Sequence, residues 1–186
     1  TYPFEEDGRM ISWNLTFGKA PSTPALLESS KLPILVLKSQ GVPIMDEPKT
    51  IMKMRLIDNG PGAVNHVSDA NDAWSGFAGL ELRGRSSQRH SKLSFGLETM
   101  DSAGQKGKAT KLLDLPKEKD FVLTANHSDK SLLRNYMAYA LYGEMGRYSP
   151  RMRFVDVVID GEYRGVYLLG EKIQRGKDRV DISRMD

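Results

Sequence analysis

Basic and hydroxyl side chains gather in one stretch of the sequence, RGRSSQRHSK, from Arg83 to Lys92. Segments of alternating polarity flank this stretch, so we expect it to form a loop between two strands. A short loop with free amides, hydroxyls and cations is suited to binding a phosphate group. A solvated turn with surface charges has the same composition, and charged loops are common. The residues alone leave both interpretations open.

Three other polar positions could take part in chemistry. Lys92 opens the second of the two strands, where its ammonium group can point inward toward a phosphate or a carboxylate. Arg134 and Asn135 fall in the first turn of a predicted helix, where the helix dipole favours anions. Arg134 therefore either reaches a carboxylate or a phosphate or is simply exposed. Glu171 ends an apolar strand, and it could pair with a buried cation, bind a ligand or lie at the surface.

Several apparent motifs do not support a site of their own. His127, Ser128 and Asp129 are the residue types of a hydrolase triad, but a triad needs convergence in space, and these residues are explained as a helix cap. The sequence GQKGKAT lacks the spacing of a phosphate-binding P-loop. The three histidines are scattered, and the chain has no cysteine, so a thiolate metal site, a disulfide and a cysteine nucleophile are excluded.

One helix and one hairpin are expected to position these residues. Ser128 or Asp129 can cap the helix, and Gly146 is expected to end it. Apolar residues at helical spacing predict that one face of this helix is buried: Leu133, Tyr136, Met137, Ala140, Leu141 and Met145. Asp160 and Gly161 predict a two-residue turn of a hairpin, because both residue types tolerate positive φ.

Short apolar or alternating segments supply the strands. They are predicted at 32–39, 50–58, 77–84, 92–101, 121–126, 153–159 and 162–169. The chain shows no alternation of strands with helices that would indicate a parallel sheet. We therefore expect an α+β fold, a mostly antiparallel β-sheet with one major helix packed on it.

Composition limits the class of protein. Hydrophobic residues make up 39% and charged residues 27% of the 186 positions, which is typical of one globular domain or a large part of one. A net charge of +3 does not indicate nucleic acid or an anionic membrane as a partner. No apolar run is long enough to span a membrane. Residues 1–31 are rich in Pro and Ser toward their end, and we expect an irregular lead-in segment.

A series of motifs resembles the CotH kinase family, relatives of a bacterial spore-coat kinase. The motifs extend from about Leu32 to Ser183: LPILVL, DEPK, LRGRSSQ, K-x-SFGLET-x-D, FVLTAN, DKSLLRN, GRYSPR, DGEYRGVYLLGEKI and DRVDIS. The resemblance implies an atypical protein kinase of exported bacterial proteins. It further implies that the full-length protein uses ATP and a divalent cation such as Mg²⁺ to phosphorylate Ser or Thr of secreted or surface proteins.

Position by position, the resemblance implies a nucleotide-binding site. Lys92 matches the family's strand lysine, the expected phosphate contact. Glu171 matches a glutamate near the place where a kinase hinge would meet adenine. The other nucleotide-binding candidates match the family's R-G-x-S-S loop and its helix R-N pair: Arg83, Gly84, Ser86, Ser87, Arg134 and Asn135.

The sequence also departs from the family pattern. His90-Ser91 replaces the usual F-P before the lysine, and Phe121 replaces a Trp. The family's metal-binding and catalytic aspartates lie in a C-terminal lobe, which we expect to follow Asp186. We therefore expect residues 32–186 to be an N-terminal lobe that resembles part of a protein kinase, lacks its own catalytic and metal ligands, and is inactive alone.

The expected partners are this C-terminal lobe and a secreted or surface protein substrate. An exported bacterial location is implied, although the sequence does not exclude the cytoplasm and does not predict an oligomeric state. Two other functions stay open. The chain could be a non-catalytic binding module of the cell surface or envelope on the same scaffold, or a structural sheet domain with no ligand.

Overall fold

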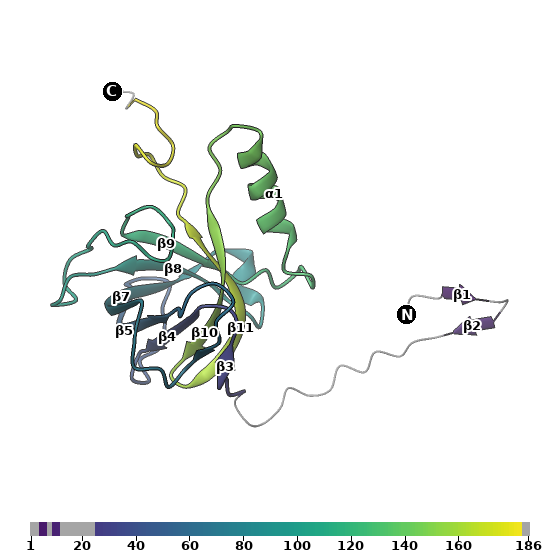
Figure 1. Cartoon of the computed structure of the whole chain (residues 1–186), viewed down its shortest axis with the longest axis horizontal. Helices are drawn as coiled ribbons and strands as arrows, with labels where there is room; N and C mark the ends of the chain where they lie inside the picture. Colours follow the sequence, from purple (N-terminus) through teal and green to yellow (C-terminus); the bar gives the residue numbers. More distant parts are fainter. Residues whose placement is uncertain (1–3, 7–8, 12–24, 184–186) are drawn as a thin grey trace.

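The computed structural model describes residues 4–6, 9–11 and 25–183 of the chain (Figure 1). Asp186, after which we expect the catalytic and metal-binding aspartates, lies outside the described residues, and so does much of the predicted lead-in segment. Near the N-terminus, β1 (Phe4–Glu6) and β2 (Arg9–Ile11) pair as antiparallel strands. A second short antiparallel pair consists of β3 (Ser29–Ser30) and β6 (Asn65–His66).

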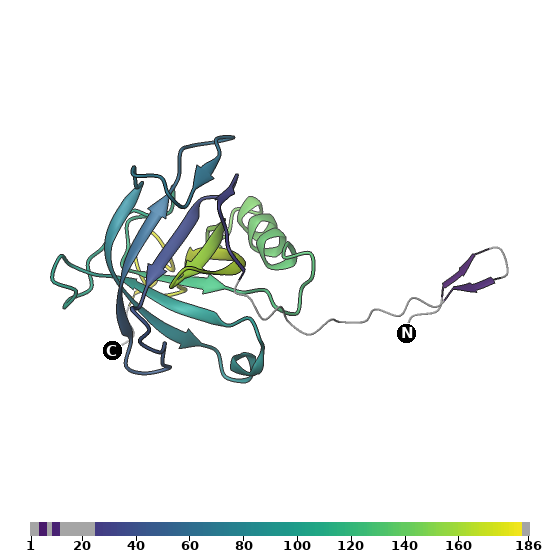
Figure 2. The same cartoon turned by 90° about the horizontal axis from the view of Figure 1, so that it is seen from below.

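Seven strands close into a barrel in the order β10-β11-β9-β8-β7-β5-β4 (Figures 1 and 2). The strands are β4 (Ile34–Lys38), β5 (Thr50–Ile57), β7 (Trp74–Arg83), β8 (Ser94–Thr99), β9 (Asp120–Thr124), β10 (Met152–Ile159) and β11 (Glu162–Glu171). Neighbouring strands are antiparallel except β4 and β10, which run parallel and close the barrel. Closure pairs both edges of the sheet.

The barrel interior is the main hydrophobic core. Alternate residues of each strand point inward, and the core is filled by aliphatic and aromatic side chains such as Leu35, Met54, Leu80, Phe121 and Leu169. A smaller cluster lies on the other face of β4, where Ile34 and Val36 pack with Val158. Strand β4 is therefore apolar on both faces, which explains its uninterrupted ILVL sequence.

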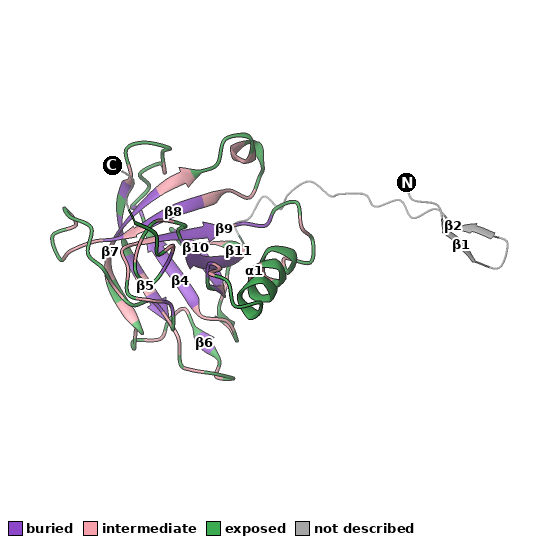
Figure 3. Ribbon diagram, turned by 90° about the horizontal axis from the view of Figure 1, so that it is seen from above, coloured by how far each residue is buried: buried purple, intermediate pink, exposed green. Residues whose placement is uncertain are grey.

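The expected α+β fold is wrong. The described chain is mostly β, and its barrel is closed rather than covered by a major helix. The α-helix of the described residues, α1 (Arg134–Glu144), is short, and none of its residues is buried (Figure 3). It contacts the barrel through the Tyr136 ring, whose centroid lies 5.1 Å from that of Phe154. Helical spacing indicated an apolar face but could not show that the barrel fills its own core.

The predicted ends of the local elements are partly confirmed. Helix α1 begins five residues after Asp129, whose carboxylate nevertheless accepts a 2.8 Å hydrogen bond from the Arg134 amide. Gly146, with φ 75°, follows the helix end as expected. Asp160 and Gly161 have φ of 50° and 85° and connect β10 directly to β11, which confirms the two-residue turn.

Candidate functional site

A cavity of about 580 Å³ opens beside the β10–β11 turn. Three segments and Leu82 of β7 line it; the segments are the loop 39–44 after β4, residues 91–95 at the start of β8, and residues 159–167 around the turn. Its wall is apolar where Ile44, Leu82, Phe95 and Tyr167 meet, and polar where Lys92 enters. The rings of Phe95 and Tyr167 stack with centroids 6.2 Å apart. The cavity therefore combines an aromatic wall with a cationic group.

Lys92 is the half-buried cation of this cavity. Its ammonium donates a 2.5 Å hydrogen bond to the Val166 carbonyl and lies 4.5 Å from the centroid of the Tyr167 ring. Burial lowers the pKa of Lys92, and the negative charge of Asp156 only partly opposes this shift. Within the part of the chain that the structure describes, no carboxylate forms an ion pair with Lys92. The direct contacts of its ammonium are a carbonyl oxygen and a ring face, and the negative charge of the buried Asp156 acts on it from farther away.

A bulge in β11 brings the backbone to this ammonium. The register of β10 and β11 shifts between Val157 and Val158, which places an extra residue in β11 near Gly165. Gly165 has φ 94°, a conformation that other residues rarely adopt. A Cβ atom at Gly165 would lie 3.5 Å from the Lys92 Nζ, in contact with it. The positive φ of Gly165 therefore permits the bulge, whereas a Cβ atom there would make only an ordinary contact with Lys92.

The carboxylates that line the cavity already have partners. Asp160 accepts hydrogen bonds from the Ser39 amide at 2.8 Å and from the Ser39 hydroxyl at 2.5 Å. Burial alone would raise the pKa of Asp160, but these bonds and those from the following amides outweigh it and lower the pKa. Glu162 forms a 3.0 Å ion pair with Arg164. Neither carboxylate neutralises Lys92, which leaves this cation available to an anionic ligand.

The candidate R-G-x-S-S loop flanks the cavity without lining it. Arg83 ends β7, and the 3₁₀ helix η1 (Ser86–Arg89) follows Gly84. Gly84 has φ 103°, and a Cβ there would lie 2.0 Å from the Ser87 hydroxyl oxygen, so the position requires glycine. The cavity wall includes Leu82 and Ser91 on either side of this loop, but not Arg83, Gly84, Ser86 or Ser87.

The candidate residues of α1 lie outside the cavity as well. The Arg134 side chain is 84% exposed, and its Nε lies 3.7 Å from an Asp129 carboxylate oxygen. Asn135 donates a 2.7 Å hydrogen bond from its amide to the side-chain oxygen of Asn126, just after β9. Asn135 thus attaches the first turn of α1 to the end of a barrel strand.

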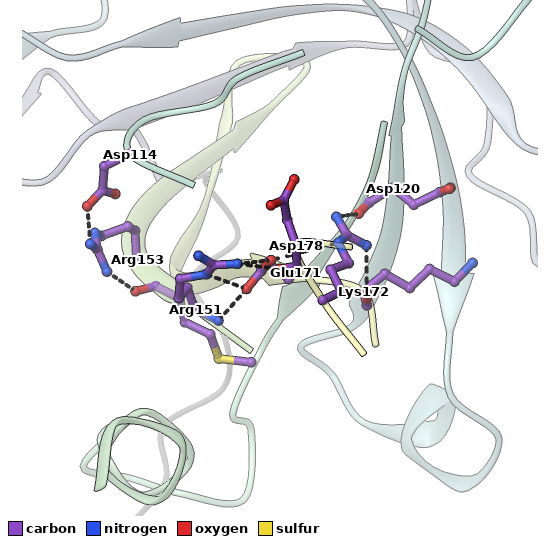
Figure 4. A network of polar contacts seen from close by, with 9 residues as sticks. Asp114, Asp120, Arg151, Arg153, Glu171, Lys172 and Asp178 are labelled. Atoms are coloured by element: carbon purple, nitrogen blue, oxygen red, sulfur yellow. Dashed lines mark hydrogen bonds and ion pairs between the residues drawn. The ribbon is translucent and has the colours of Figure 1, made fainter. Parts of the chain in front are cut away.

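Glu171 lies at the other end of β11, where its buried carboxylate pairs with the half-exposed side chain of Arg151 (Figure 4). The residue is 1% exposed, and its carboxylate accepts three hydrogen bonds from Arg151: from the amide at 2.8 Å, from Nε at 2.9 Å and from Nη2 at 3.0 Å. The hydrogen bond to Glu171 raises the pKa of the Arg151 guanidinium. Both oxygens of this carboxylate are therefore occupied by one side chain and its backbone.

Arg179 completes the cluster from the segment after β11. It is 4% exposed and donates to the carbonyl oxygens of Lys172 at 2.6 Å and Asp120 at 2.8 Å. Its Nε lies 3.7 Å from Glu171. Arg179 thereby connects the segment after β11 to β9.

The structure does not bring Lys92 and Glu171 together. Lys92 contacts β11 at Val166, five residues before Glu171, which corresponds to about 16 Å along the strand. Only Lys92 among the predicted nucleotide-binding residues lines the cavity. The nucleotide roles of the others stay predictions. The sequence analysis did not identify Arg151 and Arg179 as partners of Glu171. The sequence indicated only that Glu171, a charged residue at the end of an apolar strand, could pair with a buried cation.

A family model described as CotH kinase protein matches residues 80–185, more than half of the chain. The chain belongs to the CotH kinase protein family. The matched region covers Lys92, the loop before it and the Glu171 cluster, so both ends of β11 lie within the part of the chain that defines its family. No curated protein sequence matches the chain.

Metal-ligating side chains are not clustered in the described part of this CotH family member. Across the described residues, no three His, Cys, Asp or Glu side chains are grouped so that they could hold a metal ion. That the ligands of the divalent cation and the catalytic aspartates follow Asp186 stays a prediction.

Among the residues that the structure describes, no helix has the length and apolar character needed to cross a membrane.

Proposed function

We propose that the cavity beside Lys92 binds the phosphate groups of ATP, and that this chain is the nucleotide-facing portion of an exported CotH-like protein kinase. The whole enzyme would transfer the γ-phosphate to a Ser or Thr hydroxyl of a secreted or surface protein. The observation that carries the proposal is the half-buried Lys92 ammonium, which faces an open cavity without a carboxylate partner among the described residues.

Electrostatics favours an anion at this position. A half-buried ammonium has lost part of its hydration, and this burial lowers the pKa of Lys92. A phosphate would replace the lost hydration with a charge-assisted hydrogen bond. Lysine is a common phosphate ligand that acts as a point charge. The binding of an anion would accordingly raise the pKa of Lys92 back toward its ordinary value.

The cavity also fits the size and character of a nucleotide. Ligand sites in proteins measure about 300–1,000 Å³ and combine apolar walls with a few polar groups. The volume of about 580 Å³ falls within that range, and Phe95 and Tyr167 offer aromatic surface to a base or ribose. Arg164, which pairs with Glu162, also lines the cavity.

We further propose that the metal ligands and the catalytic carboxylate belong to the C-terminal lobe that the family resemblance implies. Phosphoryl transfer requires a positioned metal ion and a carboxylate that orients the acceptor hydroxyl. We therefore expect the purified chain to transfer no phosphate when it is incubated with Mg²⁺, ATP and an acceptor protein. Robust metal-dependent phosphorylation by the chain would contradict this expectation, although it would leave the binding cavity in place.

Calorimetric titration with ATP tests the binding proposal. Lys92→Met removes the ammonium while keeping a long apolar side chain, and Lys53→Met on the exposed outer face of β5 is the matched control. We expect Lys92→Met to weaken ATP binding by about 10- to 100-fold, the usual effect of losing a hydrogen bond to a charged group, and Lys53→Met to have little effect. Equal affinities for the two variants would contradict the proposal. Absence of binding in the unmodified chain would instead favour a non-catalytic binding module.

A further inference from the structure

Tyr167 carries a hydroxyl group that the barrel core does not satisfy. The residue is 2% exposed, and its ring belongs to the core beside Phe95. No hydrogen bond joins its hydroxyl to any residue that the structure describes. A buried phenol usually has a hydrogen-bond partner. Packing in the core therefore explains the ring of Tyr167 but not its hydroxyl.

This hydroxyl opens into the cavity beside Lys92. Tyr167 lines that cavity, and its oxygen is not among the polar side-chain atoms that the described residues enclose completely without a partner. Burial raises the pKa of Tyr167 to about 12, and the positive charge of Arg164, which also lines the cavity, partly opposes the shift. The phenol is thus protonated at neutral pH and can donate a hydrogen bond to a group in the cavity.

Lys92 brings further donors to the same ring. Its ammonium lies 4.5 Å from the centroid of the Tyr167 ring. An ammonium has three N–H donors, and one of those of Lys92 meets the Val166 carbonyl. The ammonium and the phenol therefore offer donors from one part of the cavity wall. A ligand with several closely spaced acceptor oxygens can accept from both groups, and a phosphate group is such a ligand.

We propose that Tyr167 is a second phosphate-binding residue of the cavity, whose hydroxyl donates a hydrogen bond to the same phosphate group that the Lys92 ammonium binds. This inference rests on the proposed function, since it requires a phosphate at Lys92. The phosphate would replace the hydration that both groups lose on burial. Packing of the Tyr167 ring in the core, against Phe95, holds the side chain in place, so binding would cost little side-chain entropy.

Tyr163 provides a matched comparison. It lines the same cavity, but its hydroxyl donates a 2.5 Å hydrogen bond to the carboxylate of Asp156, a residue that is 3% exposed. Tyr163→Phe leaves this buried carboxylate without that donor and should lower the urea midpoint of unfolding. Tyr167→Phe removes a hydroxyl that has no partner among the described residues, so the midpoint should not fall. A fall in Tyr167→Phe as large as in Tyr163→Phe would assign the Tyr167 hydroxyl a structural role and contradict the proposal.

A double variant tests whether one phosphate group meets both residues. If Lys92 and Tyr167 bind the same group, the loss of ATP affinity in Lys92→Met/Tyr167→Phe should be smaller than the product of the two single losses, by at least about threefold. Losses that multiply without such coupling would place the Tyr167 hydroxyl at a different part of the ligand and contradict the shared contact.

Calorimetric titration with inorganic tripolyphosphate and with ATP tests the contact itself. Tyr167→Phe should weaken the binding of both by about tenfold, the effect of losing one hydrogen bond to a charged group, whereas Tyr163→Phe should bind both as the unmodified chain does.

The outcomes separate this inference from the proposed function. If Tyr167→Phe binds ATP as tightly as the unmodified chain while Lys92→Met binds it weakly, the role of Tyr167 is wrong and the nucleotide site stands. If tripolyphosphate binding depends on Tyr167 but ATP does not bind, the phosphate contact stands and the nucleotide proposal is wrong. A loss in Tyr167→Phe that is confined to ATP, or a chain that binds neither probe, would overturn the phosphate contact.

Discussion

Two regions of β11 differ in how the charged side chains beside them are partnered. Near the middle of the strand, the Lys92 ammonium donates a hydrogen bond to the Val166 carbonyl and lies over the Tyr167 ring. It forms no ion pair with a carboxylate among the described residues. At its end, Glu171 is fully buried and accepts three hydrogen bonds from Arg151. One charge faces an open cavity of about 580 Å³, and the other is enclosed by protein.

This difference separates a candidate ligand site from a structural cluster within one strand. The buried Glu171 carboxylate has both oxygens hydrogen-bonded, so it has no capacity left for a ligand, and removing it leaves the guanidinium groups beside it uncompensated. A desolvated cation without a counter-ion gains most when an anion arrives. We infer that the Glu171 end holds the barrel and its C-terminal segment together, whereas the Lys92 region is available for binding.

The largest expected effect is on stability at the Glu171 end. Glu171→Gln removes the carboxylate charge and leaves the guanidinium groups of Arg151 and Arg179 without it. We expect the free energy of unfolding in urea to fall by about 3–5 kcal/mol. Glu162→Gln is the control: it breaks an ion pair whose two side chains are both more than 40% exposed, and it should cost at most about 1 kcal/mol. Similar losses of unfolding free energy in Glu171→Gln and Glu162→Gln would contradict a special structural role for Glu171.

A smaller loss should follow from removing Arg179. Arg179→Met takes away hydrogen bonds to two carbonyls and should destabilise the chain by about 1.5–3 kcal/mol, since these bonds involve a charged donor. Amide exchange in residues 172–183 should accelerate more than exchange in the barrel strands. Lys177→Met, at an exposed neighbouring site, is expected to change neither measurement. Uniform acceleration across the barrel would show that Arg179 does not act on this segment in particular.

Beside the cavity, Asp160 should give a small effect that depends on pH. Its carboxylate has a lowered pKa in the folded chain, so it stabilises the fold above the ordinary value of 3.8 and loses that contribution as the pH falls through its lowered value. Asp160→Asn keeps the turn, because Asn tolerates positive φ. We expect a difference in unfolding free energy below about 1 kcal/mol at neutral pH, reduced by solvent screening, which shrinks in acid. A difference that grows in acid would contradict this.

Removing Lys92 should change stability least. Lys92→Met loses the hydrogen bond to Val166 but also removes a desolvated charge, so the free energy of unfolding should stay within about 1 kcal/mol of its original value. The folded-state pKa of Lys92 lies below its ordinary value of 10.5. The unfolded chain therefore binds the Lys92 proton more tightly than the folded chain. The free energy of unfolding of the original chain should rise as the pH increases from the lowered pKa of Lys92 to 10.5, and that of Lys92→Met should not show this rise. A large loss of stability would assign Lys92 to the structural core.

Local features of the fold could be predicted from the sequence, whereas its closure could not. The Asp160-Gly161 turn follows from residues that tolerate positive φ, and the buried β4 follows from the ILVL run. Closure depends on parallel pairing of β4 with β10, more than one hundred residues later, such as Leu35 with Val157. No local pattern specifies that pairing. An open sheet would need a helix to cover it, and that assumption produced the wrong fold class.

The site was predictable to a similar extent. Lys92 could be selected because it opens a strand after a basic loop, and the structure places it in a cavity. The partner of Glu171 could not be identified, because Arg151 and Arg179 reach it only through the folded arrangement of β10, β11 and the segment that follows. The prediction that Leu133, Met137, Leu141 and Met145 lie on a buried helix face is wrong, because all four are exposed and periodicity shows that a face is apolar but not what covers it.

Protection of Lys92 from chemical modification tests the central claim most directly. An amine-reactive reagent, with mass spectrometry to quantify each modified lysine, compares Lys92 with the exposed Lys53 in the same sample. With ATP at about ten times its dissociation constant, modification of Lys92 should slow about tenfold while that of Lys53 stays unchanged. If Lys92 reacts at the same rate with and without ATP, the cavity does not bind the nucleotide through this residue and the account is wrong.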